Sequence, residues 1–465
     1  MGTRAAMICI SIAPQSHRLG MADIVNAAPQ CDLVEVRLDT LVRTPEVGLF
    51  LENRQKPVLI SCPRLQDGGV WQRTEEQRLT ILRQAIVGGA DYVQLELDIA
   101  DQVPRYGKTK RVISCTAREP VRGGLDAVYQ RACSLDADVV KLTAPTATLE
   151  EAWPLLQLMA KPAVPIVAVG VGEPGLTLSL LGRKLGSPWI YAALEKGMEA
   201  HPGQATVREL EEIYRWRDIN RRTRLVGVAG FTEQQRLTVQ LMNEVFAELD
   251  LNTRCLPMEV GDLSHFKRMM RSLRVSACVV NEAYWASLFP VVDESEEAAR
   301  LSRHTDLVVK QKNEGWYGYS SLWRAAILAL EGTLQSKDQR ADTGPAERTI
   351  EGGKAPVGDQ NPQPAAPNPK PLQGRTVLVA GASSAARALC YGIKRRGGLL
   401  AVTGPDSDRA KLVAQMFQAR YVPLQRSYDT MYDVLLMAPP EKDAKGNRRE
   451  NFDLAYLRAS SVILD

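Results

Sequence analysis

The amino-acid sequence predicts an α/β protein that begins with a (β/α)8 TIM barrel and continues into two smaller α/β segments. Eight short runs of β-branched residues alternate with helix-compatible stretches over about the first 215 residues, and eight parallel strands are the number that closes such a barrel. An open doubly wound sheet is the weaker alternative. A proline-rich stretch then interrupts the chain. A strand, a turn of small residues and a helix follow it, which is typical of nucleotide-binding folds.

The predicted barrel strands are apolar, rich in β-branched residues and separated by helical stretches. They are Met7–Ala13, Leu33–Asp39, Val58–Arg64, Tyr92–Asp98, Arg111–Ala117, Val139–Pro145, Ile166–Gly172 and Trp189–Leu194. Helices are predicted between them at Thr74–Gly88, Leu125–Leu135 and Thr148–Met159. The barrel is therefore predicted to occupy residues 1–221.

The remaining chain is predicted to form three parts. Residues 222–335 hold strands at Leu225–Ala229, Thr253–Val260 and Ala277–Asn281, with a helix at Glu233–Leu249. Residues 336–374 are rich in proline and almost without large apolar side chains, so they are predicted to be a disordered linker. Residues 375–465 begin with a strand at Thr376–Ala380 and a helix that runs through Arg395.

Composition argues against several function classes. The 465 residues carry 58 Lys and Arg against 54 Asp and Glu, a net charge of +4, which does not favour nucleic acid or a membrane surface as a partner. No apolar run is long enough to span a membrane, and no secretory signal is apparent. The eight cysteines are scattered without a C-x-x-C pair, which indicates reduced thiols and no metal site. We expect a cytoplasmic protein.

Charged residues occur inside the predicted barrel strands, where burial of an unpaired charge is costly. They are Glu35 and Arg37 on the second strand, Arg64 at the end of the third, Glu96 on the fourth and Lys141 on the sixth. One interpretation is a buried ion-pair network or an outward-facing alternation. The other is an active site, because the catalytic residues of such barrels lie at the carboxyl ends of the strands.

Lys141 favours the active-site interpretation. Burial in an apolar barrel disfavours a charged amine, so part of the lysine is neutral and nucleophilic. A neutral amine can attack a carbonyl group and form a Schiff base, whose cationic nitrogen accepts electrons. Arg37 and Arg64 would then bind an anionic or polyhydroxylated substrate, while the carboxylates would hold hydroxyl groups.

These residues belong to a series of motifs. The segments V-E-V-R-L-D, S-C-P-R, V-Q-L-E-L-D, D-V-V-K-L-T and H-P-G-Q occur in this order and resemble type I 3-dehydroquinate dehydratase. The resemblance implies syn elimination of water from 3-dehydroquinate in the shikimate pathway, through an imine on Lys141 and without metal or redox cofactor. It implies a homodimer through the barrel. It also implies a substrate site of Glu35, Arg37 and Arg64, with Glu96 supporting the base and Gln204 on a closing loop.

Three positions depart from the resembled family. Its histidine base on the fifth strand has no counterpart in Ile113–Arg118. Its Ser-Arg pair after the seventh strand corresponds to Ser179 and Leu180, and its lid serine corresponds to Ala200. The candidate substitutes are His201, beside the lid position, and Arg183, one helical turn beyond Leu180. Two candidates for the general base therefore remain, His201 and a water molecule held by Glu96.

The downstream half resembles shikimate dehydrogenase, with a substrate domain followed by a partial Rossmann domain. The motifs are V-G-V-A-G, M-N-E-V-F, L-F-P-V-V-D, G-Y-S-S-L-W and V-L-V-A-G-A-S-S-A-A-R. Trp285 and Leu322 stand where the family has a lysine and an aspartate, and neither can exchange a proton.

The Rossmann-type turn is the candidate cofactor-binding segment of this region, with NADP as the possible cofactor. Its candidate cofactor-binding residues are Gly381, Ala382, Ser383, Ser384 and Ala385. Thr403-Gly404-Pro405 replaces the family's Asn-Arg-Thr, whose arginine favours NADP, so we expect no intact NADP site.

The sequence thus predicts a dehydratase barrel fused to a degenerate, C-terminally truncated dehydrogenase-like region. One alternative is a pseudoenzyme that binds a metabolite or serves as a scaffold for a partner protein. Another is a different Schiff-base lyase or aldolase, with Leu180 indicating a substrate that lacks the usual carboxylate.

Overall fold

The computed structural model describes residues 6–52, 54–117, 124–172, 175–230, 233–258, 260–261, 263–313, 315–342, 370–440 and 462–464. The chain forms two compact units, Met1–Cys278 and Val279–Asp465. The predicted boundary between residues 221 and 222 is therefore not a boundary between compact units, and the predicted 222–335 segment is divided between them. None of the helices in the described ranges is long and apolar enough to cross a membrane.

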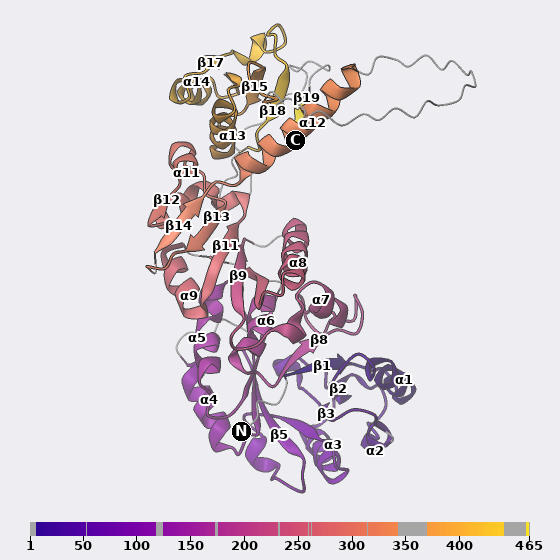
Figure 1. Ribbon diagram of the computed structural model, residues 1–465. Coiled ribbons are helices and arrows are strands. Elements are labelled where there is room, and N and C mark those ends of the chain that lie inside the picture. Colours follow the sequence, from indigo (N-terminus) through magenta and orange to yellow (C-terminus); the bar gives the residue numbers. More distant parts are fainter. Residues whose placement is uncertain are drawn as a thin grey trace, which may run out of the picture. The chain divides into compact units, whose positions relative to one another are not determined.

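The first unit begins with eight parallel strands, at the positions that the sequence predicts. They are β1 (Met7–Ile12), β2 (Leu33–Arg37), β3 (Val58–Ser61), β4 (Tyr92–Glu96), β5 (Lys110–Thr116), β6 (Val139–Pro145), β7 (Ile166–Val171) and β8 (Trp189–Ala192). Their hydrogen-bonded order is β7-β6-β5-β4-β3-β2-β1-β8. The two strands at the ends of this order, β7 and β8, are consecutive in the chain, so the sheet curls round into a barrel. The predicted TIM-barrel fold class is confirmed (Figure 1).

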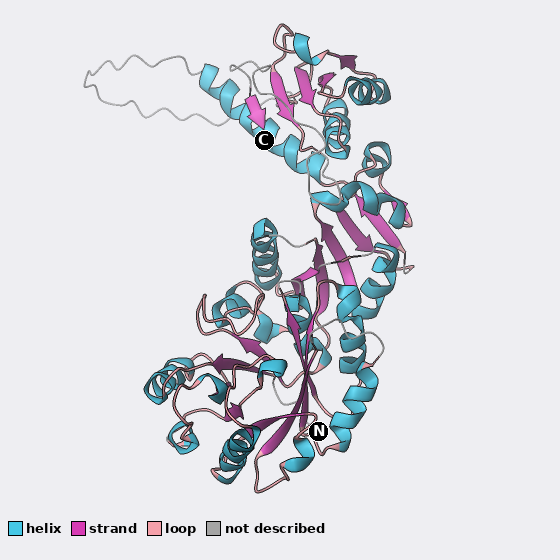
Figure 2. Cartoon of the chain, turned by 180° about the vertical axis from the view of Figure 1, so that it is seen from behind, coloured by secondary structure: helices cyan, strands magenta, loops and turns pink. Residues whose placement is uncertain are grey.

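Helices connect the barrel strands and lie outside them (Figure 2). Two of them begin where the sequence supplies a capping box: Thr74 with Gln77 at α3, and Thr206 with Glu209 at α7. The barrel helices are α1 (His17–Ala27), α2 (Val47–Leu51), α3 (Glu75–Val87), α4 (Leu125–Ser134), α5 (Leu149–Ala160), α6 (Gly175–Leu185) and α7 (Val207–Glu212).

The barrel interior is layered. Side chains two apart on a strand face the same side, so the inward-facing positions can be followed along each strand. An apolar cluster fills the amino-terminal part, formed by Cys9, Leu33, Leu59, Tyr92, Val112, Val139, Val167, Val169, Trp189 and Tyr191. The next inward positions towards the carboxyl ends are polar on six strands: Ser11, Glu35, Ser61, Gln94, Ser114 and Lys141. A polar layer therefore lies on an apolar floor.

The first unit continues past the barrel into β9 (Arg224–Ala229), α8 (Glu233–Glu248), β10 (Thr253–Met258) and α9 (Phe266–Leu273). β10 pairs in parallel with β9, and β11 (Val275–Val280) follows. The Thr177 hydroxyl on α6 donates to the Pro257 carbonyl at 2.6 Å. The buried Asn243 amide on α8 donates to the Ile213 carbonyl, just beyond α7, at 2.8 Å. These bonds join β9 and β10 to the barrel, which explains why the compact unit extends beyond residue 221.

The second unit contains strands of two sheets. Of the six-stranded sheet it holds β13 (Leu307–Lys310), β14 (Trp316–Tyr319) and β12 (Glu294–Ser295), paired in that order, with α10 (Trp285–Leu288) and α11 (Glu297–Ser302) nearby in the chain. The other sheet has the order β17-β16-β15-β18-β19, all parallel. Its elements are β15 (Thr376–Ala380), α13 (Ser384–Arg395), β16 (Leu399–Thr403), α14 (Ser407–Met416), β17 (Arg420–Tyr421), β18 (Val434–Met437) and β19 (Val462–Leu464).

The predicted linker, residues 336–374, begins before the preceding helix has ended. Helix α12 spans Leu322–Asp342, so the first part of the predicted 336–374 segment is helical. Residues 336–342 contain neither proline nor glycine, and these are the residues that break helices. Residues 343–369, the core of the predicted linker, lie outside the described residues.

Candidate active site

A cavity of about 240 Å³ lies at the carboxyl ends of the barrel strands, above the polar layer. We call it the barrel pocket. It contains the predicted residues Glu35, Arg37, Lys141, His201 and Gln204 together. Its other lining residues are Ser11, Pro63, Asp67, Gly68, Gln94, Thr116, Thr143, Val169, Val171, Tyr191 and Ala200.

Lys141 is held by three electron-rich groups. Its Nζ donates to Oε1 of Gln94 at 2.9 Å and lies 3.7 Å from Oε1 of Glu35. The same Nζ lies 4.4 Å from the ring centroid of Tyr191, within cation–π range. The lysine side chain is 15% exposed. The amine is thus largely withdrawn from water but lines the pocket, which is the geometry that a Schiff-base nucleophile requires.

Glu35 and Arg37 share the inward face of β2. Burial by itself would raise the pKa of Glu35, but the charge of Lys141, with that of Arg37, lowers it on balance. The carboxylate is therefore ionised at neutral pH. The guanidinium of Arg37 is fixed by two hydrogen bonds to the Asp39 carboxylate, at 2.7 and 3.2 Å. Positive Lys141, negative Glu35 and positive Arg37 thus follow one another along the wall of the barrel pocket.

The loop after β8 closes one side of the pocket. Oε1 of Gln204 accepts a hydrogen bond from the Ala200 amide at 2.6 Å, which shapes the loop. Nδ1 of His201 lies 3.2 Å from the Pro202 carbonyl. A neutral imidazole in this position donates from Nδ1, which leaves Nε2 as an acceptor. Burial, with a smaller effect from the charge of Lys141, lowers the pKa of His201, so the neutral form predominates at pH 7.

Arg64 does not line the barrel pocket. It lines an adjoining cavity of about 270 Å³. Its guanidinium donates to Asp67 at 2.7 Å and to both oxygens of Asp98 at 2.8 Å each. Asp67 and Thr116 line both cavities. The structure thus places Asp67, and not Arg64, at the barrel pocket.

The prediction that Glu96 supports the base does not agree with its position. Glu96 lines the adjoining cavity and pairs with the fully buried Arg78 at 2.7 Å. The same guanidinium donates to the Cys62 carbonyl at 2.8 Å. Burial raises the pKa of Glu96 despite the charge of Arg78. This buried pair joins β4 to α3, so the ion-pair interpretation explains Glu96 better than a role in holding a catalytic water.

Arg183 lies at the opposite end of the barrel. Its guanidinium donates to the carbonyls of Ala6, Arg217 and Ile219 at 3.0, 2.6 and 2.6 Å and stacks on Trp216. Ala6 precedes β1, so this is the amino-terminal face of the barrel. The expectation that Arg183 replaces a substrate-binding arginine is wrong, because α6 carries it away from the carboxyl ends of the strands.

The pocket residues that were not predicted from the sequence include Asp67, Gln94, Thr116 and Tyr191. Gln94 and Tyr191 could have been found, because each lies two positions beyond an inward-facing aromatic residue on its strand. Asp67 follows a strand by several residues, and its approach to the pocket depends on the loop. Thr116 is the side chain that the fifth strand presents to the pocket. It therefore occupies the region where the resembled family has its histidine.

The comparison with family models decides what the barrel is. Residues 8–221 match the model of type I 3-dehydroquinase. The barrel is a type I 3-dehydroquinase domain. Its match contains Lys141 and every other residue of the barrel pocket. Within the described residues, no group of His, Cys, Asp and Glu side chains could hold a metal ion.

Similar proteins extend the comparison past the dehydroquinase domain. The bifunctional 3-dehydroquinate dehydratase/shikimate dehydrogenase of Arabidopsis thaliana is 25% identical over 396 residues, covering 83% of this chain and 62% of its own length. The chain thus spans less than two thirds of that relative. A 3-dehydroquinate dehydratase of Methanococcus maripaludis is 29% identical over 220 residues, covering 44% of this chain and 98% of its own. The region after the dehydroquinase domain is shikimate dehydrogenase-like.

A solved structure gives a weaker likeness. The dehydroquinate dehydratase and shikimate dehydrogenase from S. pombe AroM is 16% identical, with 94% of this chain and 83% of that chain covered. The TM-score is 0.38.

The turn before α13 stands where a Rossmann fold binds a dinucleotide. Gly381 has φ +125°, which only glycine adopts without strain. Ser383 is buried, and its hydroxyl accepts from the Ala386 amide at 3.2 Å and donates to the Pro439 carbonyl at 2.7 Å. Its side chain therefore takes an amide at the helix start, where a pyrophosphate would bind. Ala382, Ser384 and Ala385 are also buried, and in this structure the Ala386 amide is bonded to Ser383 and not open to a ligand.

Trp285 and Leu322 have structural partners in the second unit. The Trp285 indole donates to the Val280 carbonyl at 2.8 Å, and its ring packs edge-on against His304 at 4.5 Å. The Leu322 amide donates to the Asp306 carboxylate at 2.6 Å. Neither side chain can take or give a proton.

Proposed function

We propose that the dehydroquinase domain dehydrates 3-dehydroquinate to 3-dehydroshikimate through a Schiff base on Lys141. The observation that carries this proposal is the position of Nζ in the barrel pocket, between Gln94 and Glu35 and over the ring of Tyr191. The family of the domain supports the same reaction. The alternatives of a binding-only barrel and of another Schiff-base lyase or aldolase are outcomes of the experiment below.

The chemistry proceeds in four steps. The Nζ ammonium first gives up a proton to water, the neutral amine then adds to the C3 carbonyl, and loss of water gives an iminium ion. A base removes a C2 proton, and the electron pair flows into the iminium to give an enamine. Collapse of the enamine expels the C1 hydroxyl, which leaves as water after protonation. Hydrolysis then frees Lys141, so one substrate molecule gives one enone and one water.

His201 is the best-supported base. It lines the barrel pocket, its lowered pKa keeps it neutral, and Nε2 is the acceptor when Nδ1 donates to Pro202. Thr116 has no useful basicity at neutral pH. Glu35 is better assigned to orienting the amine and a substrate hydroxyl, because its charge is balanced by Lys141. Gln204 and Arg37 are the groups that would hold the substrate's hydroxyl and carboxylate groups.

Trapping tests the proposal directly. The full chain is incubated with 3-dehydroquinate and sodium borohydride, and the modified peptide is mapped by mass spectrometry. We expect one reduced adduct on Lys141, together with enone absorbance in the untreated reaction. Lys141→Met should abolish both, and Lys184→Met, which changes a lysine at the other end of the barrel, should abolish neither.

The trapping result separates the alternatives. An adduct on Lys141 without enone formation would indicate a binding-only barrel or a different lyase. The absence of any adduct at millimolar substrate would overturn the proposal.

We further propose that the shikimate dehydrogenase-like region does not oxidise shikimate. Ser383 takes the amide at the start of α13, and Trp285 and Leu322 replace proton-transfer groups. The full chain with shikimate and NADP should therefore form no NADPH. Formation of NADPH at a rate that depends on both compounds would contradict this.

A further inference from the structure

A second, larger cavity lies at the amino-terminal face of the barrel, opposite the barrel pocket. Its volume is about 710 Å³, within the range of sites for small molecules. Met7, Tyr92, Lys110 and Val139 line it, and each is the first residue of its strand. We call it the amino-terminal cavity. The other lining residues are Ala6, Asp138, Pro165, Arg183, Gly186, Ser187, Pro188, Ile219, Asn220, Arg221 and Arg222.

The floor of this cavity is apolar and its rim is cationic. Met7, Val139 and Ile219 contribute apolar surface. Lys110, Arg221 and Arg222 contribute positive charge, and within the described residues none of the three has an ion-pair partner. The rim carries one acidic residue, Asp138, whose carboxylate lies 3.0 Å from Arg105 and accepts from the Arg111 amide at 2.7 Å. The net charge facing a ligand is therefore positive.

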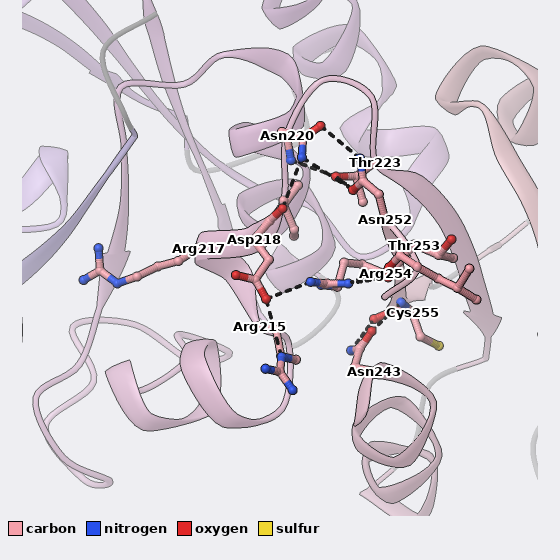
Figure 3. Close-up of polar contacts among 12 residues, drawn as sticks. Arg215, Arg217, Asp218, Asn220, Thr223, Asn243, Asn252, Thr253, Arg254 and Cys255 are labelled. Carbon is pink, nitrogen blue, oxygen red and sulfur yellow. Dashed lines mark hydrogen bonds and ion pairs between the residues drawn. The ribbon is translucent and has the colours of Figure 1, made fainter. Parts of the chain in front are cut away.

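The two arginines are presented by a fixed turn. The Asn220 amide donates to the Thr223 hydroxyl at 2.8 Å, and the Arg222 amide donates to Oδ1 of Asn220 at 2.9 Å. The Thr223 hydroxyl in turn donates to Oδ1 of Asn252 at 2.7 Å (Figure 3). Because the backbone is held, less conformational freedom is lost when the exposed side chains bind a ligand.

A neighbouring cavity at the same end of the barrel adds further positive side chains. Its volume is about 690 Å³, and it shares Pro165, Gly186 and Arg221 with the amino-terminal cavity. It adds Lys161 and Arg274, both exposed and without an ion-pair partner in the described part of the chain. Within the described residues, five cationic side chains without an ion-pair partner thus border one continuous recess, and one of them, Lys110, also lies over the Tyr92 ring at 5.2 Å from its centroid. This positive charge is more than one carboxylate needs, and it suits a ligand with several negative charges.

We propose that the amino-terminal cavity binds an organic phosphate of nucleotide size, with its apolar or aromatic part on the floor and its phosphates on Arg221 and Arg222. Guanidinium groups bind phosphate through paired hydrogen bonds, and the floor distinguishes an organic phosphate from an inorganic one. A polynucleotide is not favoured, because the chain's net charge is only +4. The site is independent of the proposed dehydration.

Calorimetric titration of the full chain tests this site, with ATP as the probe and pyrophosphate and adenosine as its parts. We expect ATP to bind more tightly than either part, with an affinity that falls as salt rises. R221Q/R222Q should weaken ATP binding at least about tenfold, since two charge-assisted contacts are lost. R18Q/R43Q removes two exposed arginines outside the cavity and should leave the affinity unchanged.

Three results would overturn the proposal. They are no ATP binding up to about 1 mM, equal weakening in both double variants, and pyrophosphate binding as tightly as ATP. Borohydride trapping on Lys141 should be unchanged in R221Q/R222Q. Loss of the ATP site with intact trapping therefore separates a failure of this site from a failure of the proposed dehydratase activity.

Discussion

The ionisation state of His201 decides whether it can remove a proton. A partly buried imidazole is harder to charge than one in water, and the neighbouring ammonium of Lys141 adds to that effect, so the pKa of His201 lies below the ordinary value of a histidine. A base must be deprotonated to act. Activity that depends on His201 is therefore complete at neutral pH and is lost as the pH falls through this lowered pKa.

His201→Asn should lower kcat by about 10²- to 10⁴-fold, the usual contribution of a positioned base. The acid limb of kcat/KM in the unsubstituted chain should lie below pH 6.5, and the variant should lose that limb. Borohydride trapping on Lys141 should persist, because imine formation does not need the base.

A matched control is His17→Asn. His17 stacks on Phe50 outside the barrel pocket, so its replacement should leave the pH profile unchanged. If His201→Asn kept both full kcat and the acid limb, His201 would not be the base, and Asp67 would be the next residue to test.

At the scale of elements, one buried amide joins α8 to β10. Nδ2 of Asn243 donates to the carbonyls of Ile213 and Cys255 at 2.8 and 3.0 Å, and Oδ1 accepts from the Cys255 amide at 2.7 Å (Figure 3). The side chain is fully buried. Water cannot replace these bonds in the native state, so this amide ties the end of the dehydroquinase domain to the segment that follows.

Asn243→Ala should therefore destabilise the first unit by about 3 kcal/mol, since buried backbone groups lose their partners. Urea unfolding followed by tryptophan fluorescence measures the change. The control is Gln240→Ala on the same helix, which loses only the pair with Glu244 at 3.0 Å and should cost less than about 0.5 kcal/mol. Equal costs for the two variants would show that the Asn243 network contributes nothing beyond helix propensity.

At the scale of the whole molecule, the chain consists of two compact units whose division does not follow the predicted modules. Residues 222–278 belong with the barrel, because Thr177 and Asn243 connect them to it. The shikimate dehydrogenase-like region is thus shared between the units. Folding should follow the units and not the sequence relationships.

Differential scanning calorimetry of the full chain should show two transitions. Asn243→Ala should lower the midpoint of one by about 5–10 °C and leave the other in place. A single transition that shifts as a whole would mean that the two units unfold cooperatively.

The sequence alone was sufficient to locate the barrel and to single out Lys141 as its candidate nucleophile. Strand and helix periodicity is local, so the eight strands could be located to within a few residues, and Lys141 was conspicuous as a charge in an apolar strand. Glu35, Arg37, Gln204 and His201 were also placed correctly at the pocket. Each lies on a strand end or on the loop that follows one, where the topology of a barrel leaves little choice.

Tertiary structure alone decided which charges face the pocket and which are paired elsewhere. Glu96 and Arg183 carry the right chemistry, but Arg78 neutralises the first and α6 directs the second to the opposite face. Both outcomes depend on partners distant in sequence, and no local pattern encodes them. The position of Asp67, the extent of the first unit and the cationic recess at Arg221 and Arg222 have the same origin, because each is created by segments that meet only when the chain is folded.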